Sequence, residues 1–480
     1  MHLPSQLIKS LTGIKGFDKE SFELVHALPA EITSIRFNPA KNNSLKKEVK
    51  QDEADMQTAN YKPQTSSPVP WSTHGYYLSE RPFFTYDPFF HAGCYYVQEA
   101  SSMFLEQAIK QTVDINTDIK VLDLCAAPGG KSTLLQSIIS PGSLLVSNDV
   151  IKSRAGIIEE NLTKWGVANV IVTNNDPGSF ARLENFFDVI VIDAPCSGSG
   201  LFRRDPSAMD EWSEENVQLC SQRQQRIIAD TWPALKQNGV LIYSTCSYSI
   251  KENEEISDWI RESFNVTSCK LSIDDSWGII ETISTRHSAY GYRFWPDRIK
   301  GEGFFIACFR KQEGAAYVSN HSKKSKLEFL TKPDQAIVFN WIQKDVPVQL
   351  VKSGDSILAL PGGMEMSLQS LREASIYIRQ AGIRVGKIAG KDFIPDHALA
   401  VSTLANDQLV AISLNREQAL QYLRKEEVQI NEIVSGKGQT ATVGQGWALV
   451  RYAGVSIGWV KILKNRINNY YPKEWRIRKK

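Results

Sequence analysis

Short apolar runs alternate with amphipathic stretches through the middle of the chain. Five runs predict buried strands: 119–126, 144–149, 169–173, 187–193 and 240–245. Four stretches with helical spacing lie between or after them: 131–139, 152–165, 213–236 and 251–264. Such strand–helix repeats are typical of a parallel sheet with both faces covered. Two later runs, 264–271 and 303–310, can close the sheet as an antiparallel pair. We therefore expect an α/β domain built on a mostly parallel, seven-stranded sheet.

The residues before this pattern predict a smaller region of mixed α and β structure. Residues 3–27 have roughly helical spacing, and 35–38 predict a strand. The polar stretch 42–67 predicts a linker or a long loop. The stretch 97–110 predicts a helix with an apolar face.

The C-terminal part carries short β-like runs separated by glycine turns, which predict a small barrel. The patterns together divide the chain into an N-terminal region, a sheet domain, a linker, a mixed α/β region and the barrel: 1–92, 93–312, 313–334, 335–395 and 396–480. The last twenty residues hold eight Lys/Arg against one Glu, interleaved with Tyr470, Tyr471 and Trp475. This composition fits a contact with looped or single-stranded RNA, and equally a solvated tail.

Length and composition limit the class of protein. A chain of 480 residues suggests about two to four domains. The net charge is only +2, so any nucleic-acid binding must depend on local patches. The seven cysteines form no CxxC pair, which argues against zinc and for reduced thiols. The N-terminus does not resemble a signal peptide, and no run reaches the roughly 18 apolar residues of a membrane span. We expect a cytoplasmic monomer that binds neither a metal nor a membrane.

The segment 121–132 carries the first chemistry. A buried strand breaks at Pro128-Gly129-Gly130 and a helical pattern begins near Lys131, so backbone N–H groups can face a nucleotide-like ligand. Gly130-Lys131-Ser132 mimics the end of a P-loop, but Cys125 stands where a P-loop needs its first glycine. The other interpretation is the cofactor loop of a methyltransferase that uses S-adenosylmethionine (SAM).

Acidic residues follow the next two predicted strands. Asp149 lies about twenty residues after the glycines, where a carboxylate can accept hydrogen bonds from ribose hydroxyls. Asp176 follows the third strand, where an acid can meet an adenine, although Asn-Asp-Pro-Gly is also a common turn. Asp149 therefore favours an adenosyl ligand over a P-loop.

Two cysteines follow the fourth and fifth predicted strands, in Asp193-Ala-Pro-Cys196 and in Thr245-Cys246. Ligands of open α/β sheets bind beyond the carboxyl ends of the strands, so Asp193, Cys196 and Cys246 are expected to share one cleft with the methyl donor. Free cysteines are often simply buried, but two of them at strand ends favour chemistry.

Thiols suit one methyl acceptor in particular, because carbon 5 of a pyrimidine is not nucleophilic by itself. A thiolate that adds to carbon 6 turns carbon 5 into an enamine-like nucleophile, and a base later removes the carbon-5 proton before the thiol leaves. The attacking cysteine must be a thiolate, so nearby positive charge has to lower its pKa. A protonated or proton-sharing carboxyl must stabilise charge at cytosine N3, and Asp193 is the candidate.

These segments resemble the Nop/Sun family of RNA cytosine-carbon-5 methyltransferases. The segments that carry the resemblance are Asp123–Lys131, Asp193–Gly200, Arg203–Pro206, Tyr243–Ser247 and Glu252–Glu255. Upstream, Ser34–Asn38 and Tyr96–Ser102 also look like family segments. The C-terminal part is similar to the RNA-binding extension of a bacterial ribosomal-RNA group in this family, most clearly at Arg466–Pro472.

The resemblance implies a Rossmann-like class I methyltransferase domain, an N-terminal RNA-binding region and a C-terminal PUA-like β-barrel. It implies SAM as cofactor and 16S small-subunit ribosomal RNA as substrate. It assigns the attack on carbon 6 to Cys246 and product release to Cys196, with Asp193 touching both cofactor and base. The implied cofactor pocket consists of Cys125, Ala126, Ala127, Pro128, Gly129, Gly130, Lys131, Asp149, Asp176 and Asp193.

Three alternatives stay open at this point. Transfer RNA is the closest competitor as substrate, because the catalytic core would look alike. A non-catalytic RNA-binding assembly factor would not need the set of Asp149, Asp193, Cys196 and Cys246. An amino-group methyltransferase would favour an aromatic residue where Cys196 stands.

Overall fold

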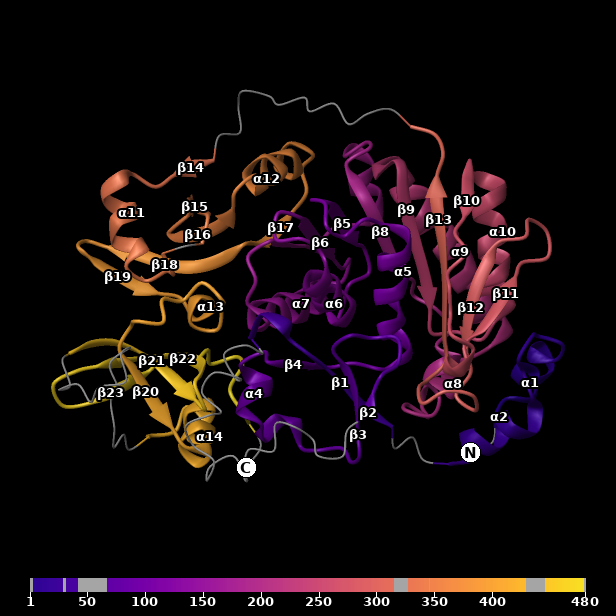
Figure 1. Cartoon of the computed structure of the whole chain (residues 1–480), viewed down its shortest axis with the longest axis horizontal. Coiled ribbons are helices and arrows are strands. Elements are labelled where there is room, and N and C mark those ends of the chain that lie inside the picture. The colour runs from indigo at the N-terminus through magenta and orange to yellow at the C-terminus, as the bar shows by residue number, and fades with distance from the viewer. Residues whose placement is uncertain are drawn as a thin grey trace.

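A large mixed sheet forms the centre of the molecule, with smaller sheets beside it (Figure 1). The computed structural model describes residues 3–28, 32–41, 67–314, 327–344, 346–428 and 445–478. Most of the predicted loop at 42–67 and the middle of the predicted linker, 315–326, lie outside these residues.

Five parallel strands make the middle of the sheet and carry apolar side chains on both faces. They are β5 (Lys120–Asp123), β6 (Leu144–Asn148), β7 (Val170–Thr173), β8 (Phe187–Asp193) and β9 (Leu235–Thr245). They lie in the order β9-β8-β5-β6-β7, so the chain reverses direction across the sheet between β5 and β8. The five predicted strands and their parallel pairing are confirmed. Their apolar side chains suit this sheet, because helices cover both of its faces.

Helices cover the two faces of this sheet: α5 (Leu105–Thr112), α6 (Gly130–Ile138), α7 (Lys152–Trp165), α9 (Glu214–Thr231) and α10 (Glu254–Ser263). The helix predicted at 213–236 is too long. After α9 a short 3₁₀ turn, Trp232–Ala234, contains Pro233, and β9 begins directly at Leu235. A proline has no N–H to donate, so the helix ends and the strand starts five residues before the predicted 240.

The sheet has ten strands in the described residues rather than the predicted seven. The expected antiparallel pairing of β10 (Val266–Ser268) with β13 (Phe304–Lys311) is present. The sheet also contains a hairpin of β11 (Ile280–Ile283) and β12 (Tyr290–Phe294), and at its far edge β17 (Ile378–Ala381), which pairs with β7. The three added strands have only four or five residues, too few to show a periodicity. β17 comes from a distant part of the chain and pairs with the backbone groups of β7, which would otherwise be an edge strand.

The N-terminal region packs beside the carboxyl ends of the central strands. Its helices are α1 (Ser5–Leu11), α2 (Lys19–Ala27) and α4 (Pro88–His91). Its sheet has the order β2-β3-β1-β4 and consists of β1 (Thr33–Phe37), β2 (Ser67–Pro68), β3 (Gly75–Leu78) and β4 (Tyr95–Val97). The predicted strand at 35–38 is confirmed. The helix predicted at 97–110 is wrong in its first part, because Tyr95–Val97 pairs with β1 and the α-helix begins only at Leu105.

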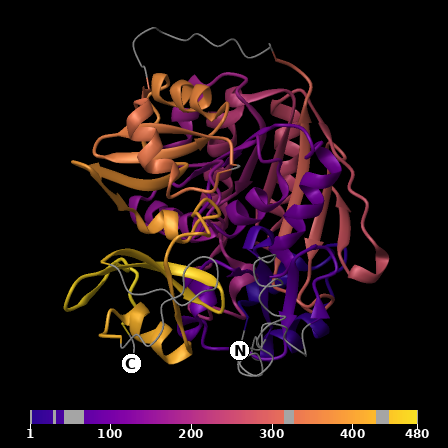
Figure 2. The same cartoon turned by 60° about the vertical axis from the view of Figure 1, so that its left-hand side comes forward.

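Two further sheets complete the chain and lie on the same side of the central domain (Figures 1 and 2). The first has β14 (Glu328–Phe329), β15 (Val348–Ser353), β16 (Ser356–Pro361), β18 (Ile383–Ala389) and β19 (Asp392–Pro395), with α11 (Lys332–Phe339), α12 (Met364–Glu373) and α13 (His397–Ala400). The second has β20 (Ala411–Leu414), β21 (Gly446–Tyr452), β22 (Val455–Ile462) and β23 (Ile467–Asn469), with α14 (Arg416–Arg424).

Two of the three C-terminal aromatic residues are structural. Tyr471 is 1% exposed and belongs to the core of the second sheet. Trp475 packs edge-on against His397, with ring centroids 5.2 Å apart. Only Tyr470 is largely exposed, so the composition of the tail overstates the aromatic surface open to RNA. Of the helices in the described ranges, none is both long and apolar enough to cross a membrane.

Candidate active site

The loop after β5 is fixed in place by contacts to neighbouring strands and to α7. Leu124 N donates to Val191 O at 3.0 Å, and Ala126 N donates to Asn148 O at 2.8 Å. From α7, Arg154 donates to Ala127 O at 3.2 Å and Asn161 donates to Pro128 O at 2.8 Å. Gly129 has φ +111°, a left-handed conformation that lets α6 begin at once. The first N–H groups of α6 therefore face the carboxyl edge of the sheet.

Asn148 ties the ends of three strands together, and sequence reasoning missed it. Its Nδ2 donates to Leu124 O at 3.2 Å and to Asn175 O at 3.0 Å. Its Oδ1 accepts hydrogen bonds from Thr173 Oγ1 and Asn175 N, both at 2.9 Å. Its position directly before Asp149 was the only signal that could have indicated it.

The two acids assigned to the adenosine end of the pocket differ in their surroundings. Asp149 is buried, accepts a hydrogen bond from Ile151 N at 2.8 Å and lies 3.6 Å from Arg154. Asp176 caps the 3₁₀ turn Pro177–Arg182 by accepting from Gly178 N at 3.0 Å, and its side chain is 58% exposed. Asp176 therefore has the turn role that its Asn-Asp-Pro-Gly setting also indicated, and Asp149 is the better placed carboxylate.

Lys131 and Asp193 form an ion pair at the end of β8. Lys131 Nζ lies 2.7 Å from Asp193 Oδ2, and Ser244 Oγ donates to Asp193 Oδ1 at 2.8 Å. Burial alone would lower the pKa of Lys131, but the Asp193 carboxylate outweighs it and raises that pKa. The proton of this pair therefore resides on Lys131. The expectation that Asp193 itself holds or shares a proton at cytosine N3 stays a prediction.

A buried carboxylate next to the loop fits a cationic ligand group. Asp123 Oδ2 accepts from Ser132 Oγ at 2.6 Å, whereas its Oδ1 is buried without a hydrogen-bond partner. Burial raises the pKa of Asp123 to about 7. An unpartnered buried oxygen is costly unless a ligand satisfies it. The ammonium group at the methionine end of SAM is a donor of the required kind, so the residues of this loop fit that cofactor.

The two strand-end cysteines lie together. Cys196 Sγ and Cys246 Sγ are 3.0 Å apart, and both residues are partly exposed. The hydrogen bond with Cys246, together with burial, raises the pKa of Cys196 well above its ordinary value. The loops can approach because position 200 is glycine: Gly200 N donates to Cys246 O at 2.7 Å, and a Cβ there would lie 2.6 Å from that oxygen. Two thiols this close cannot readily both ionise.

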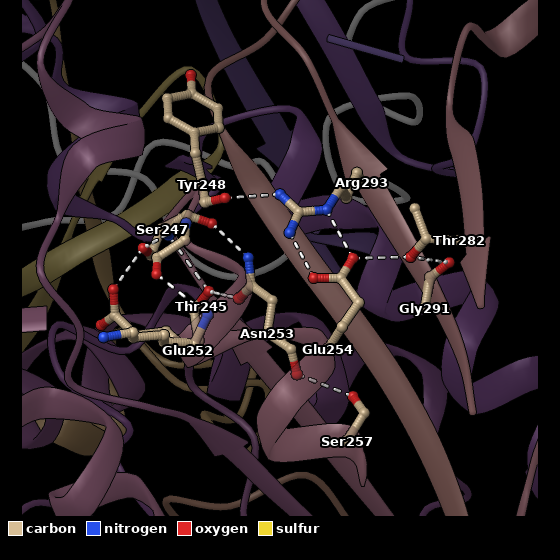
Figure 3. Close-up of polar contacts among 12 residues, drawn as sticks. Thr245, Ser247, Tyr248, Glu252, Asn253, Glu254, Ser257, Thr282, Gly291 and Arg293 are labelled. Carbon is tan, nitrogen blue, oxygen red and sulfur yellow. Dashed lines mark hydrogen bonds and ion pairs between the residues drawn. The ribbon is translucent and has the colours of Figure 1, made fainter. Parts of the chain in front are cut away.

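Glu252 anchors the two loops that carry Cys196 and Cys246. Its carboxylate accepts from Ser197 N at 2.8 Å, and from the hydroxyls of Ser197 and Ser247 at 2.6 Å each. Gln224 Nε2 donates to the same carboxylate at 3.2 Å and to Pro195 O at 3.0 Å. Figure 3 shows Glu252 reaching Ser247 from the turn that precedes α10. The residue occurs in a family-like segment, but its role as a shared anchor follows only from the structure.

A second layer of contacts supports this turn (Figure 3). Asn253 accepts from Thr245 Oγ1 at 2.6 Å and donates to Ser247 O at 2.8 Å. Arg293 of β12 pairs with Glu254 and donates to Tyr248 O at 2.8 Å. The β11–β12 hairpin absent from the predicted sheet thus fixes the segment that follows Cys246.

Replacing Glu252 with alanine should destabilise the protein by roughly 3 kcal/mol, because four buried donors lose their acceptor. Thermal unfolding would measure the loss. The rate at which Cys196 and Cys246 react with iodoacetamide, followed by peptide mass spectrometry, should rise in the same variant. Glu252→Gln keeps the side-chain volume and one acceptor oxygen, so it should lose less. An unchanged melting temperature and unchanged thiol reactivity in Glu252→Ala would contradict an anchoring role.

Comparison with known proteins gives matches along most of the chain. Residues 110–310 match the family model of 16S rRNA methyltransferase RsmB/F. Residues 3–100 match the N-terminal domain of 16S rRNA methyltransferase RsmF, and 410–477 match the methyltransferase RsmF PUA domain. These matches agree with the expected Rossmann-like methyltransferase domain and with the expected C-terminal PUA domain.

Individual relatives are similar over their whole length. The ribosomal RNA small subunit methyltransferase F of Vibrio parahaemolyticus is 28% identical over 466 residues, which is 93% of this chain and 95% of the relative. That of Psychromonas ingrahamii is 28% identical over 98% of this chain and 97% of its own. The crystal structure of NSun6 from Pyrococcus horikoshii with SFG has a TM-score of 0.52 and 20% identity, and covers 65% of this chain and 98% of that one. At that identity the likeness concerns the fold.

Proposed function

We infer from these matches that the chain belongs to the 16S rRNA methyltransferase RsmB/F family. On that premise we propose that it transfers the methyl group of SAM to carbon 5 of a cytosine in 16S small-subunit ribosomal RNA. The observation that carries the proposal is the pair of thiols 3.0 Å apart, next to the Lys131–Asp193 ion pair. Methylation of nitrogen or oxygen would need neither thiol.

The cofactor is held by the residues around the loop after β5. The N–H groups at the start of α6 and the free oxygen of Asp123 face the methionine end. Asp149, fixed by Ile151 N and by Arg154, receives the ribose hydroxyls. Asp176 lies at the adenine end. SAM, when bound, supplies an electrophilic methyl group on a positively charged sulfur.

Cys246 starts the reaction by adding its sulfur to carbon 6 of the cytosine. Electron density moves through the ring to N3, where Lys131, held 2.7 Å from Asp193, supplies a proton. Carbon 5 becomes nucleophilic as a result and takes the methyl group. The carbon-5 proton must then leave before the Cys246–carbon bond can break.

Cys196 is the base that removes this proton. Before the attack, the hydrogen bond with Cys246 and burial raise the pKa of Cys196, so that Cys196 keeps its proton. Once Cys246 is bonded to carbon, that contact no longer favours the neutral thiol, and Cys196 can release its proton to solvent. Its thiolate takes the carbon-5 proton, the 5,6 double bond re-forms, Cys246 leaves as thiolate and N3 returns its proton to Lys131. One proton is released per methyl group transferred.

The substrate assignment is tested directly on RNA. The purified chain should transfer labelled methyl groups from SAM to 16S ribosomal RNA and not to transfer RNA, and bisulfite mapping in a deletion strain should show one or more unmethylated cytosines in 16S RNA. Both relatives described above are named for small-subunit ribosomal RNA, which favours it over the transfer-RNA alternative. Methylation confined to transfer RNA would contradict the substrate. A failure to bind SAM in calorimetry would instead favour a non-catalytic assembly factor.

A further inference from the structure

The most exposed large hydrophobic side chain in the described residues is Phe83, at 83% exposure. It lies in the segment 79–87, between β3 and α4, which we name the 79–87 loop. A phenylalanine ring that is left in water costs free energy unless a partner covers it. The loop is therefore a candidate contact surface.

The loop is fixed although Phe83 is not buried. The neighbouring Phe84 packs against Phe90 and Tyr95, with ring centroids 6.3 and 6.0 Å away. Asp87 closes the loop by accepting from Phe89 N at 3.0 Å and from Tyr95 Oη at 2.6 Å. Pro82 precedes Phe83 and restricts the backbone further. Phe83 is thus presented to solvent on a rigid support, which lowers the entropic cost of binding.

Arginines from both ends of the chain surround this loop. The Arg81 guanidinium lies 5.5 Å from the centre of the Phe84 ring. From α14, Arg416 donates to Tyr86 O at 3.4 Å, and the Arg424 guanidinium lies 5.9 Å from the Tyr86 ring. Within the ranges that the structure describes, none of these three arginines has a carboxylate oxygen within 4.0 Å. These arginines bring positive charge from the N-terminal region and the C-terminal domain to the loop. The loop itself also contains the acids Glu80 and Asp87, and the Asp87 carboxylate interacts electrostatically with Arg416.

A shallow hollow adjoins this loop. Arg81 and Arg204 line it together with Glu99, Gly301 and Glu302.

The two acids of the hollow are occupied within the protein. Glu99 accepts from Ser101 N and from Glu302 N, each at 2.9 Å. Glu302 is paired with Arg203 at 3.4 Å. Backbone hydrogen bonds and the ion pair therefore occupy both carboxylates, whereas Arg81 and Arg204 are exposed.

We propose that the 79–87 loop is a platform for single-stranded RNA, on which Phe83 stacks against a base of the substrate strand while Arg81 and Arg416 bind backbone phosphates. Exposed aromatic rings flanked by arginines suit unpaired nucleotides, because every base offers a π-face and every phosphate a negative charge. The proposal rests on the RNA substrate proposed above and adds the residues that hold the strand.

The test compares Phe83→Ala with Phe329→Ala, a control that removes a ring 49% exposed in β14 of the first C-terminal sheet. A 16S RNA fragment that contains the mapped cytosine is the probe, and fluorescence anisotropy measures its Kd. Phe83→Ala should bind about 5- to 100-fold more weakly than the wild-type chain, and Phe329→Ala should bind as the wild type does. Both variants should keep the wild-type melting temperature and the wild-type affinity for SAM.

Two further variants separate stacking from charge. Phe83→Trp should bind RNA about as well as the wild type, and its added fluorescence should be quenched by the RNA. Arg81→Gln should reduce the slope of log Kd against log salt by about one, as expected for the loss of one phosphate contact.

The outcomes distinguish this proposal from the one on which it rests. If the wild-type chain methylates RNA and Phe83→Ala binds the fragment with unchanged Kd, the platform is overturned and the function stands. If the wild-type chain neither binds nor methylates RNA, the function fails first. If Phe83→Ala binds naked RNA normally but loses activity on assembled small subunits alone, the partner of Phe83 is a protein, and the RNA platform is overturned.

Discussion

A Cys246→Ser variant is expected to lose methyl transfer by roughly 10³-fold or more, the scale seen when an enzyme loses its covalent nucleophile. Serine keeps the shape of the side chain, but its hydroxyl does not ionise near neutral pH as a thiol does. Carbon 5 would then never become nucleophilic. Single-turnover transfer of labelled methyl groups to 16S RNA measures the effect.

The matched control is Cys269→Ser, which removes another partly exposed thiol outside the site. It should transfer methyl groups at the wild-type rate. Cys246→Ser should still bind SAM, since its side chain accepts no hydrogen bond from the loop after β5, and calorimetry checks this. Near wild-type turnover by Cys246→Ser would show that Cys246 is not the nucleophile.

A Cys196→Ala variant is expected to stop after methyl transfer and to accumulate a covalent protein–RNA adduct. Cys246 can still attack, because removal of the neighbouring thiol leaves the Lys131–Asp193 pair intact. The carbon-5 proton then lacks its base, so the bond between Cys246 and carbon 6 cannot break. A slowly migrating band on a denaturing gel, sensitive to ribonuclease and carrying labelled methyl groups, is the measurement.

The double variant Cys196→Ala/Cys246→Ala is the control for this adduct and should show no band. The outcome that would exchange the two roles is equally specific. If Cys246→Ala alone accumulates the adduct, then Cys196 is the nucleophile and Cys246 assists release. Because the sulfurs lie 3.0 Å apart, geometry alone allows either order.

The parallel core could be predicted from the chain because its signal is local. Each of β5 to β9 contains a short apolar run, and each is followed by a polar or glycine-rich break. The strand ends then locate the site, because parallel strands bring their carboxyl ends to one edge. Asp193, Cys196 and Cys246 are therefore close to one another as expected, although 50 residues separate the two cysteines.

The parts that could not be predicted depend on partners far away in the chain. β17 forms only where β7 offers an unpaired edge, and the β11–β12 hairpin is too short for a pattern. Glu252 looked like one acid among several, and its four hydrogen bonds exist only because the loops of β8 and β9 converge above it. Tyr471 looked like an RNA contact and is a core residue, since composition does not distinguish a buried ring from an exposed one.

Residue order alone determined the layered sheet, and it located the loop at 121–132 proposed to bind SAM and the two cysteines proposed for carbon methylation. It could do so because the hydrophobic period and the strand ends depend on neighbouring residues. Only the tertiary structure decided that Lys131 carries the proton of its pair with Asp193, that Cys196 is kept neutral by Cys246, and that Glu252 anchors both loops. It also decided that Phe83 faces solvent among arginines from both ends of the chain. Ionisation and exposure depend on what the fold places within a few ångströms, and spacing along the chain does not carry that information.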